Sequence, residues 1–280
     1  MSRDIEEKVD RVLEERVDKR RFREKDKDLI ETVEEVFDHY TVESLYEIMR
    51  RLNLRRIYGV VSAGKEARVY RAIDKEGKEY AVKIYLTFSS EFKKSIWKYI
   101  YGDPRFENAR ITSTKKLMYL WARKEYKNLD RMYRAGVRVP KPYGVLNNII
   151  VMEFIGESGV RAPLLKEYKL NEEEAKRIFH EIMRNVVLMF CKAKLVHADL
   201  SEYNIMIYEG EPVIIDVAQA VHVNHPNSLD FLRKDITNIY RYFTKEVGLD
   251  LEIELEELLE RVRTCRETWE EATQCTAEHT

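Results

Sequence analysis

VHADLSEYN, residues 196–204, decides the fold, because its spacing His-x-Asp-x-x-x-x-Asn is typical of the catalytic loop of phosphotransfer enzymes. Twelve residues beyond Asn204, a short apolar run ends in Asp216. In phosphoryl transfer, one carboxylate orients the attacking hydroxyl or accepts its proton, and an Asn and a second carboxylate hold Mg²⁺. We therefore predict that Asp199 is the catalytic residue and that Asn204 and Asp216 are metal ligands.

An interior lysine and a helix glutamate stand upstream of this loop. Lys83 lies on an alternating strand, in Ala81-Val82-Lys83, and Glu125 falls within the apolar stripe of a helix expected over 114–135. Because a carboxylate on a buried stripe needs a partner, we predict a Lys83–Glu125 pair that positions ATP phosphates. The alternatives are a solvated strand lysine and a glutamate at the edge of the stripe.

Two further segments are candidates for nucleotide contacts. SAGKEARV (62–69) aligns with the phosphate loop G-x-G-x-x-G-x-V, although only its middle glycine is retained. VMEFIG (151–156) is an apolar strand that leads into a glycine, which suits a hinge whose backbone could bind adenine. The ATP contacts predicted from these segments are Ser62, Gly64, Lys65, Met152, Glu153 and Ile155.

The order of the predicted elements indicates an α+β chain of two unequal lobes. Three strands (57–62, 67–73 and 79–86) form an antiparallel meander with a turn at 74–77, and a hairpin over 145–155 turns at Asn147-Asn148. A long helix is expected over 171–194, and the pattern from Ser228 onward is helical. The predicted divisions are an N-terminal helical extension (1–55), a small lobe with the sheet and one key helix (56–155), and a mostly helical lobe (156–280).

Composition excludes several classes of protein. With 44% hydrophobic and 35% charged residues, the 280-residue chain is expected to fold rather than remain disordered. No apolar stretch approaches the roughly 18 residues of a membrane helix, and the charged start lacks the apolar segment of a signal peptide. We therefore expect a cytoplasmic protein without membrane contact, in which Cys191, Cys265 and Cys275 are reduced thiols.

The charge is unevenly distributed. Residues 88–141 hold 14 Lys or Arg against 5 Asp or Glu, whereas residues 246–280 hold 11 acids against 3 arginines. A basic middle predicts a polyanionic partner, and the alternative is that these bases cover ordinary helix faces. Residues 87–113 give mixed signals. One hypothesis is a mobile loop in which Thr112, Ser113 and Thr114 accept phosphate, and the alternative is that a hydroxyl here caps the next helix.

The motifs together resemble the RIO family of atypical serine/threonine protein kinases. The matching segments are SAGKEARVY (62–70), AVKIY (81–85), VMEFIG (151–156), APLL (162–165), LVHADLSEYN (195–204), IIDVAQAV (214–221) and FLRKD (231–235). The chain looks like the first RIO subgroup in its compact, archaeal form, since the N-terminal winged helix of the second subgroup is not apparent. Ala63 departs from the subgroup, which usually has Thr there, and this puts one hydroxyl contact of the phosphate loop in doubt.

This resemblance implies a two-lobed, protein-kinase-like fold and an ATP- and Mg²⁺-dependent kinase or ATPase, with Mn²⁺ as an alternative metal. It implies phosphate contacts from Lys83 paired with Glu125, and adenine contacts from the backbone of Glu153 and Ile155. It also implies that Asp216 transiently accepts a phosphoryl group. The implied partners are the small ribosomal subunit precursor and its RNA, during late maturation of that subunit.

Three functions therefore remain open at the level of sequence. The first is a serine/threonine protein kinase, and the second is a nucleotide-driven assembly switch that hydrolyses ATP on a ribosomal particle. The third is a small-molecule phosphotransferase of the aminoglycoside- or choline-kinase kind, which would need an acidic pocket for a cationic substrate. The basic stretch 88–141 argues against the third function.

Overall fold

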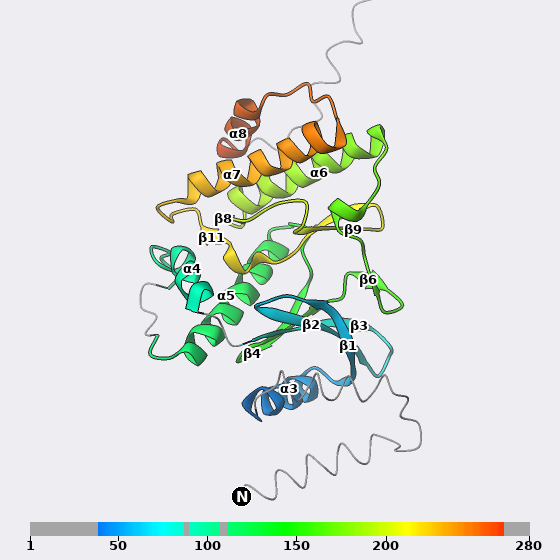
Figure 1. The fold of residues 1–280 in the computed structure, drawn as a ribbon, viewed down its shortest axis with the longest axis vertical. Helices are drawn as coiled ribbons and strands as arrows, with labels where there is room; N and C mark the ends of the chain where they lie inside the picture. The colour runs from blue at the N-terminus through cyan, green and yellow to red at the C-terminus, as the bar shows by residue number, and fades with distance from the viewer. Residues whose placement is uncertain (1–38, 87–89, 107–110, 266–280) are drawn as a thin grey trace, which may run out of the picture. The chain divides into compact units, whose positions relative to one another are not determined.

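The computed structural model describes residues 39–86, 90–106 and 111–265 (Figure 1). The chain divides into two compact units, Met1–Glu43 and Ser44–Thr280, and the description below concerns the second. Residues 1–38 of the predicted N-terminal helical extension lie outside the described residues. Among the described residues, no helix is long and apolar enough to cross a membrane.

The smaller half of this unit is built on one antiparallel sheet of five strands in the order β1-β2-β3-β5-β4. Its elements are the part of α3 (His39–Arg51) from Ser44 onward, β1 (Leu54–Ala63), β2 (Ala67–Asp74), β3 (Glu79–Tyr85), α4 (Ser90–Ile100), α5 (Thr114–Arg134), β4 (Pro142–Leu146) and β5 (Ile149–Glu153). The β2–β3 turn forms as predicted, because Asp74 Oδ1 accepts the N–H groups of Glu76 and Lys78, and Gly77 adopts a positive φ of 85°. The hairpin at Asn147-Asn148 is also confirmed.

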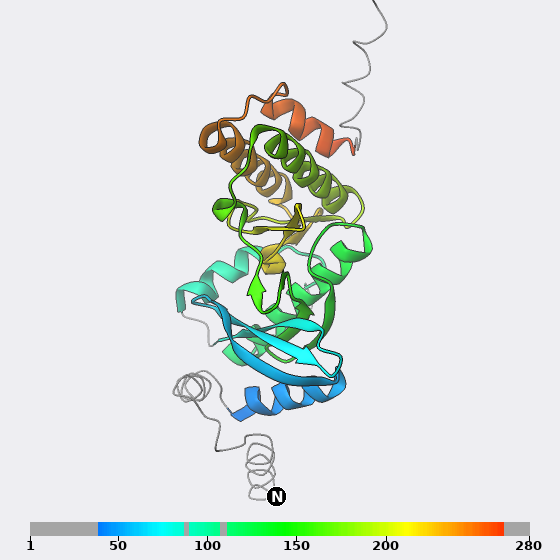
Figure 2. The same cartoon turned by 90° about the vertical axis from the view of Figure 1, so that its right-hand side faces the viewer.

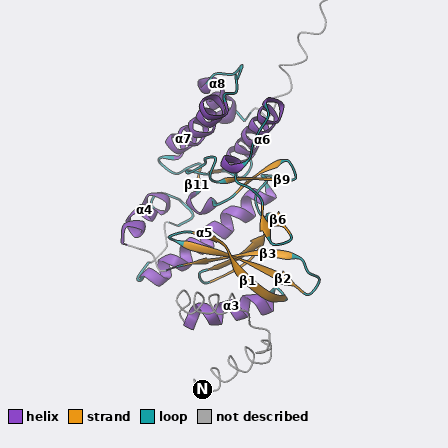
Figure 3. Cartoon of the chain, turned by 45° about the vertical axis from the view of Figure 1, so that its right-hand side comes forward, coloured by secondary structure: helices purple, strands orange, loops and turns teal. Residues whose placement is uncertain are grey.

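Helix α5 connects the sheet to the other half of the unit. Ser113 caps its start by accepting the Lys116 N–H at 3.2 Å, and Gly136, with a φ of 83°, follows its end. One side of α5 packs on β4 and β5, and it also contacts η2 (Val217–Gln219), which follows Asp216. Figure 3 shows α5 beside the sheet. The predicted helix over 114–135 is thus confirmed. The expected capping hydroxyl at the start of this helix is that of Ser113.

The larger half is mostly helical. Its elements are β6 (Gly156–Glu157), β7 (Val160–Arg161), η1 (Leu165–Glu167), α6 (Glu172–Cys191), β8 (Leu195–Val196), β9 (Ile205–Tyr208), β10 (Glu211–Ile214), η2, β11 (Val221–His222), α7 (Ser228–Arg241), η3 (Tyr242–Val247) and α8 (Leu255–Arg263). A capping box between Asn171 and Glu174 starts α6. Helices α6, α7 and α8 pack together, and the short strands lie between them and the sheet (Figures 1 and 2).

The stretch 87–113, whose sequence signals are mixed, contains α4. The buried Ile96, Tyr99 and Ile100 of this helix join the core, and Tyr99 packs between Trp121 and Phe231. Apolar residues at helical spacing outweigh the polar residues between them.

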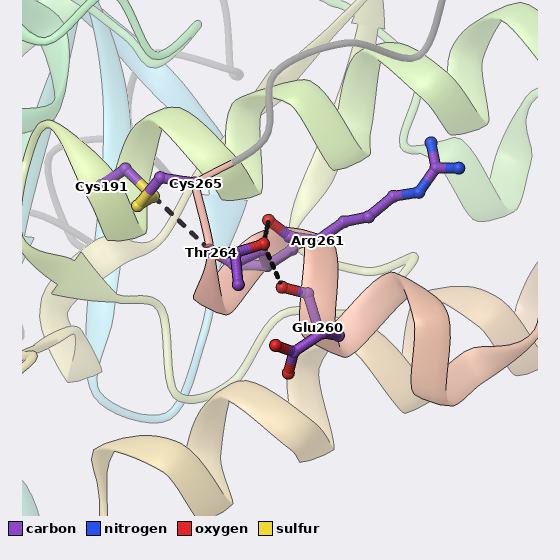
Figure 4. Close-up of a disulfide and its surroundings, with 6 residues drawn as sticks. Cys191, Glu260, Arg261, Thr264 and Cys265 are labelled. Atoms are coloured by element: carbon purple, nitrogen blue, oxygen red, sulfur yellow. Dashed lines mark hydrogen bonds between the residues drawn. A yellow bond between two sulfur atoms is a disulfide. The ribbon is translucent and has the colours of Figure 1, made fainter. Parts of the chain in front are cut away.

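Cys191 and Cys265, expected to be reduced, form a disulfide between residues 74 positions apart (Figure 4). Helix α8 packs against α6 and thereby brings the end of each helix, and its cysteine, to the same place. The third cysteine, Cys275, lies outside the described residues.

Candidate active site

Lys83 of β3 is the centre of the candidate site, because it joins the sheet, α5 and the loop that follows β10. Its Nζ lies 2.8 Å from Glu125 Oε1 and 3.0 Å from Asp216 Oδ1. Lys83 and Glu125 are buried, whereas the Asp216 side chain is 53% exposed. The predicted Lys83–Glu125 contact is therefore observed, and Asp216 is added to it with its second oxygen available to a ligand.

Electrostatics fix the charge states of this cluster. Burial acts to lower the pKa of Lys83, but the carboxylates of Asp216 and Glu125 outweigh it and hold that pKa above its ordinary value. The Lys83 ammonium in turn lowers the pKa of Asp216. Burial raises the pKa of Glu125, although Lys83 opposes the rise. Lys83 is thus a fixed cation, and Asp216 is an ionised carboxylate at the open side of the cluster.

A buried tyrosine supports the glutamate of this cluster. The Tyr85 hydroxyl, two residues after Lys83 on β3, donates to Glu125 Oε2. Burial, with the nearby Glu125 carboxylate, raises the pKa of Tyr85 well above its ordinary value, so the hydroxyl keeps its proton and remains a donor. Both Glu125 oxygens are therefore engaged, which holds this side chain in one orientation.

Helix α7 positions the backbone of the catalytic loop. The two carboxylate oxygens of Asp235 accept the N–H groups of Ala198 and Leu200, each at 2.8 Å, and Ala198 has a positive φ of 69°. These bonds flank Asp199, whose side chain is 43% exposed and lies 3.9 Å from the Nζ of Lys234. Asp235 thus stabilises a conformation that non-glycine residues rarely adopt and presents Asp199 to solvent.

Asn204 and Asp216, the predicted metal ligands, are brought near each other by a backbone hydrogen bond between Asn204 and Ile215. The Asn204 side-chain N–H donates to the Asp199 carbonyl at 2.7 Å, so its Oδ1 stays available, and the Asn204 carbonyl accepts from Ile215 N–H at 2.9 Å. An amide oxygen and an exposed carboxylate are donors that suit a hard cation such as Mg²⁺. No group of three or more His, Cys, Asp or Glu suited to a metal occurs in the described part of the chain. Any ion held here would therefore take further ligands from phosphate or water.

A buried clamp on α5 holds the turn that follows Asp216. Lys124 Nζ donates to the carbonyls of Ala218 at 2.7 Å and Ala220 at 2.5 Å. Asn128 Nδ2 donates to the carbonyls of Val217 at 2.8 Å and Ala220 at 3.1 Å. Asp216 itself has a φ of 56°, in the left-handed region. The clamp therefore stabilises the turn that aims Asp216 at Lys83.

The structure places the other predicted ATP contacts around the same cluster. Ser62 lies near the end of β1, where it pairs with Val69 of β2, and Gly64 and Lys65 lie in the exposed turn that follows. The next residue, Glu66, has a raised pKa because of burial and the nearby carboxylates of Asp216 and Asp199. Val69, which follows this loop on β2, pairs with Lys83, so the loop lies next to the strand that carries the site lysine. The Ser62 and Lys65 side chains make no hydrogen bond to Lys83 among the described residues.

The hinge strand β5 lies beside β3. Met152 pairs with Ala81, the Glu153 N–H donates to the Lys141 carbonyl at 2.8 Å, and the Ile155 carbonyl accepts from Ala162. Glu153 also pairs with Tyr80 of β3. Adenine contacts from the backbone of Glu153 and Ile155 stay a prediction.

Comparison with known proteins identifies the family. A sequence profile of the RIO domain matches residues 68–257, which is more than half of the chain. The chain belongs to the RIO family. The RIO-type serine/threonine-protein kinase Rio1 of Haloferax volcanii is 39% identical over 247 residues, covering 88% of this chain and 83% of that protein. Human serine/threonine-protein kinase RIO1 is 39% identical over 225 residues, covering 80% of this chain and 39% of the human protein.

The fold of solved RIO kinases agrees with this assignment. The Rio2 kinase of Chaetomium thermophilum aligns with a TM-score of 0.60 over 84% of this chain and 72% of that one, at 21% identity. Its ADP/Mg²⁺–phosphoaspartate complex aligns with a TM-score of 0.58 over 84% and 70%, also at 21% identity. At this identity the likeness shows the fold, which is that of a two-lobed RIO kinase.

Sequence reasoning missed four residues that the structure places around the site. They are Tyr85, Lys124, Asn128 and Asp235. For two of them the sequence held a signal: Lys124 and Asn128 follow Leu117 and Trp121 by helical spacing, so they lie on the same buried stripe as Glu125. For Tyr85 and Asp235, only the tertiary contact reveals the role.

Proposed function

We propose that this chain is an ATP- and Mg²⁺-dependent RIO-type protein kinase that transfers or hydrolyses the ATP γ-phosphate. The observation that carries the proposal is the Lys83 ammonium fixed between Glu125 and Asp216, beside the catalytic loop. A buried cation between two carboxylates suits the phosphates of ATP together with their metal. The named activity of the Haloferax and human relatives supports the same reaction.

Each residue has a role that follows from its position. Lys83 neutralises charge on the phosphates, and Asn204 and Asp216 would hold Mg²⁺, which would neutralise further charge on the transferring group. Asp199, whose side chain is partly exposed, orients the attacking oxygen and accepts its proton. When no hydroxyl substrate is bound, Asp199 would orient a water molecule instead, and the reaction would be ATP hydrolysis.

Asp216 is also our candidate for a transient phosphoryl acceptor. In that step one of its oxygens bonds to the γ-phosphorus as the bond to the ADP oxygen breaks. Water then attacks the aspartyl phosphate, releases inorganic phosphate and restores the carboxylate. The phosphoaspartate named in the Rio2 complex supports this order of events. It would make the chain a nucleotide-driven switch as much as a protein kinase.

The proposed setting is late maturation of the small ribosomal subunit in the cytoplasm, with the subunit precursor and its RNA as partners. Autophosphorylation near Thr112, Ser113 and Thr114 belongs to the same proposal. Mass spectrometry after incubation with Mg²⁺-ATP tests the latter, and a chain without phosphate on these residues would leave only the capping role of Ser113. A rise in ATP turnover when precursor particles are added would support the ribosomal role, and an unchanged rate would count against it.

The reaction is tested with γ-labelled ATP. Asp199→Ala should reduce turnover by about 10²–10⁴-fold, the range typical of a positioned acid–base group, with little change in ATP affinity. Lys234→Ala is the matched control, because it removes the neighbour of Asp199 and leaves the carboxylate. The label recovered on protein, compared with free phosphate, separates kinase from ATPase turnover. Wild-type turnover in Asp199→Ala would overturn the assignment.

A further inference from the structure

Helix α4 carries a buried tyrosine, Tyr99, that packs beside the helix holding the catalytic loop. Tyr99 is 5% exposed, and its ring lies between Trp121 of α5 and Phe231 of α7, with centroid distances of 6.3 and 5.7 Å. Phe231 lies one turn before Asp235 on α7, and Asp235 holds the backbone on both sides of Asp199. The tyrosine ring is therefore fixed next to the helix that positions the catalytic carboxylate.

The hydroxyl of Tyr99 lies close to the acids of the candidate site. Burial, together with the carboxylates of Asp199, Asp235 and Glu66, raises the pKa of Tyr99, so the hydroxyl keeps its proton. Asp199 belongs to the catalytic loop and Glu66 to the phosphate loop, so the hydroxyl lies within electrostatic range of both. Among the described residues it has no hydrogen-bond partner, and it is not one of the polar atoms sealed from solvent. It is therefore available to a small molecule at the side of Asp199.

The residues that follow α4 hold this helix in place. The Arg105 guanidinium pairs with the buried Asp103 carboxylate and donates to the Ala220 carbonyl at 3.3 Å. The carbonyl of Tyr101, the residue after α4, lies 3.0 Å from His225 Nε2. Figures 1 and 2 show α4 between the levels of the sheet and of helix α7. These contacts fix the end of α4, and the tyrosine it carries, relative to the loops of the site.

A tyrosine at this place restricts what can reach Asp199. An attacking seryl or threonyl hydroxyl arrives on a polypeptide, whose backbone and neighbouring side chains need room beside the catalytic carboxylate. The Tyr99 ring cannot move aside without losing its contacts with two other aromatic rings. A water molecule needs no such room, and Asp199 and the Tyr99 hydroxyl could hold it together. The position of Tyr99 therefore favours water over a protein hydroxyl.

We propose that Tyr99 is a specificity-determining residue that selects water over a protein hydroxyl as the acceptor of the γ-phosphoryl group. In direct hydrolysis the water oxygen bonds to the γ-phosphorus, the bond from phosphorus to the ADP oxygen breaks, and one water proton passes to Asp199. The Tyr99 oxygen accepts a hydrogen bond from the second O–H of that water. This inference rests on the proposed ATP-dependent reaction and assigns the residue that decides between its two outcomes.

The test measures how γ-labelled phosphate divides between water and an added protein acceptor. Dephosphorylated casein supplies seryl hydroxyls; its label is separated from the kinase by electrophoresis, and free phosphate is counted in the same reaction. Tyr99→Leu removes the ring and the hydroxyl but keeps an apolar side chain in the core. Its ratio of casein label to free phosphate should rise about tenfold over wild type, the scale on which a change of pocket shape alters selectivity. The matched control is Tyr101→Leu, at a side chain that is 83% exposed, and its ratio should equal that of wild type.

Tyr99→Phe separates the role of the hydroxyl from that of the ring. Because the ring is kept, casein label should stay at the wild-type level. Release of free phosphate should fall about 2–10-fold, the effect of one lost hydrogen bond to the attacking water. Tyr101→Phe should release phosphate like wild type, and calorimetric affinity for Mg²⁺-ATP should be unchanged in all four variants.

The ratio of the two products does not depend on how much of a variant is folded, so a structural defect alone cannot change it. A wild-type ratio in Tyr99→Leu would overturn this proposal and leave the proposed reaction intact. If Tyr99→Leu unfolds, phosphate release by Tyr99→Phe decides, and a rate equal to that of wild type would overturn the proposal. A wild-type protein that transfers label to neither acceptor would overturn the proposed reaction and this inference with it.

Discussion

Replacing Lys124 with Met tests whether the clamp on α5 positions Asp216. Methionine is close to lysine in length and keeps the aliphatic packing, but it cannot donate to the carbonyls of Ala218 and Ala220. Ala220 would keep the hydrogen bonds from Asn128 and Arg105, whereas Ala218 would lose the one it receives from Lys124. The turn after Asp216 should therefore loosen without losing every contact.

The expected change in stability is small, because two large terms oppose each other. Two hydrogen bonds from a charged donor contribute roughly 1.5–3 kcal/mol each. Burying an ammonium costs several kcal/mol, and burial lowers the pKa of Lys124 well below its ordinary value. We expect the free energy of unfolding of Lys124→Met to lie within about 2 kcal/mol of wild type. ATP turnover should fall about 10–100-fold, because displacing a reacting group by about 1 Å can reduce a rate by about 10².

Steady-state ATP turnover and urea unfolding measure the two quantities on the same samples. Lys127→Met is the matched control, since it makes the same change three residues later on the exposed face of α5, and its turnover should equal that of wild type. Turnover of Lys124→Met within twofold of wild type, in a folded protein, would refute the positioning role. A loss of stability far above 2 kcal/mol would refute the energetic argument.

Three other predictions rest on single contacts. Burial raises the pKa of Asp235 to about 7, so between about pH 4 and 7 the folded state binds a proton that the unfolded chain does not. In urea titrations, the free energy of unfolding of wild type should therefore fall by up to about 4 kcal/mol relative to Asp235→Asn as the pH rises through that window. Parallel pH dependence of the two proteins would contradict this prediction. Tyr85→Phe removes a hydrogen bond to the Glu125 carboxylate and should weaken ATP binding about tenfold by calorimetry, whereas unchanged affinity would make the contact incidental. Reducing the Cys191–Cys265 disulfide opens a loop of 74 residues and should lower the free energy of unfolding by up to about 4 kcal/mol, so an unfolding curve insensitive to reductant would show that the bond does not form in solution.

The parts of the fold that were predicted correctly are those specified by local sequence. The β2–β3 turn depends on Asp74 and Gly77, and the β4–β5 hairpin turns at two adjacent Asn residues. The start of α5 depends on a hydroxyl three residues from the N–H it caps. In each case the residues that interact are within a few positions of each other, so the pattern contains the physical cause.

The parts that were missed depend on contacts between distant residues. Lys124 reaches carbonyls 94 and 96 positions away, Asp235 reaches N–H groups 35 and 37 positions away, and Cys191 bonds to a cysteine 74 positions away. No local pattern encodes these pairs. The Lys83–Glu125 pair is likewise distant, but a buried carboxylate and an interior lysine each lack a local partner, which made that contact predictable.

The central claim is that Lys83, Asn204 and Asp216 form the Mg²⁺-ATP site. Calorimetric titration of ATP with and without Mg²⁺ tests it most directly, in wild type, in Asp216→Ala and in a control that removes an exposed acid elsewhere, Asp250→Ala. We expect Mg²⁺-dependent ATP binding in wild type and in the control, and its loss in Asp216→Ala. Metal-dependent affinity in Asp216→Ala equal to that of wild type would contradict the assignment.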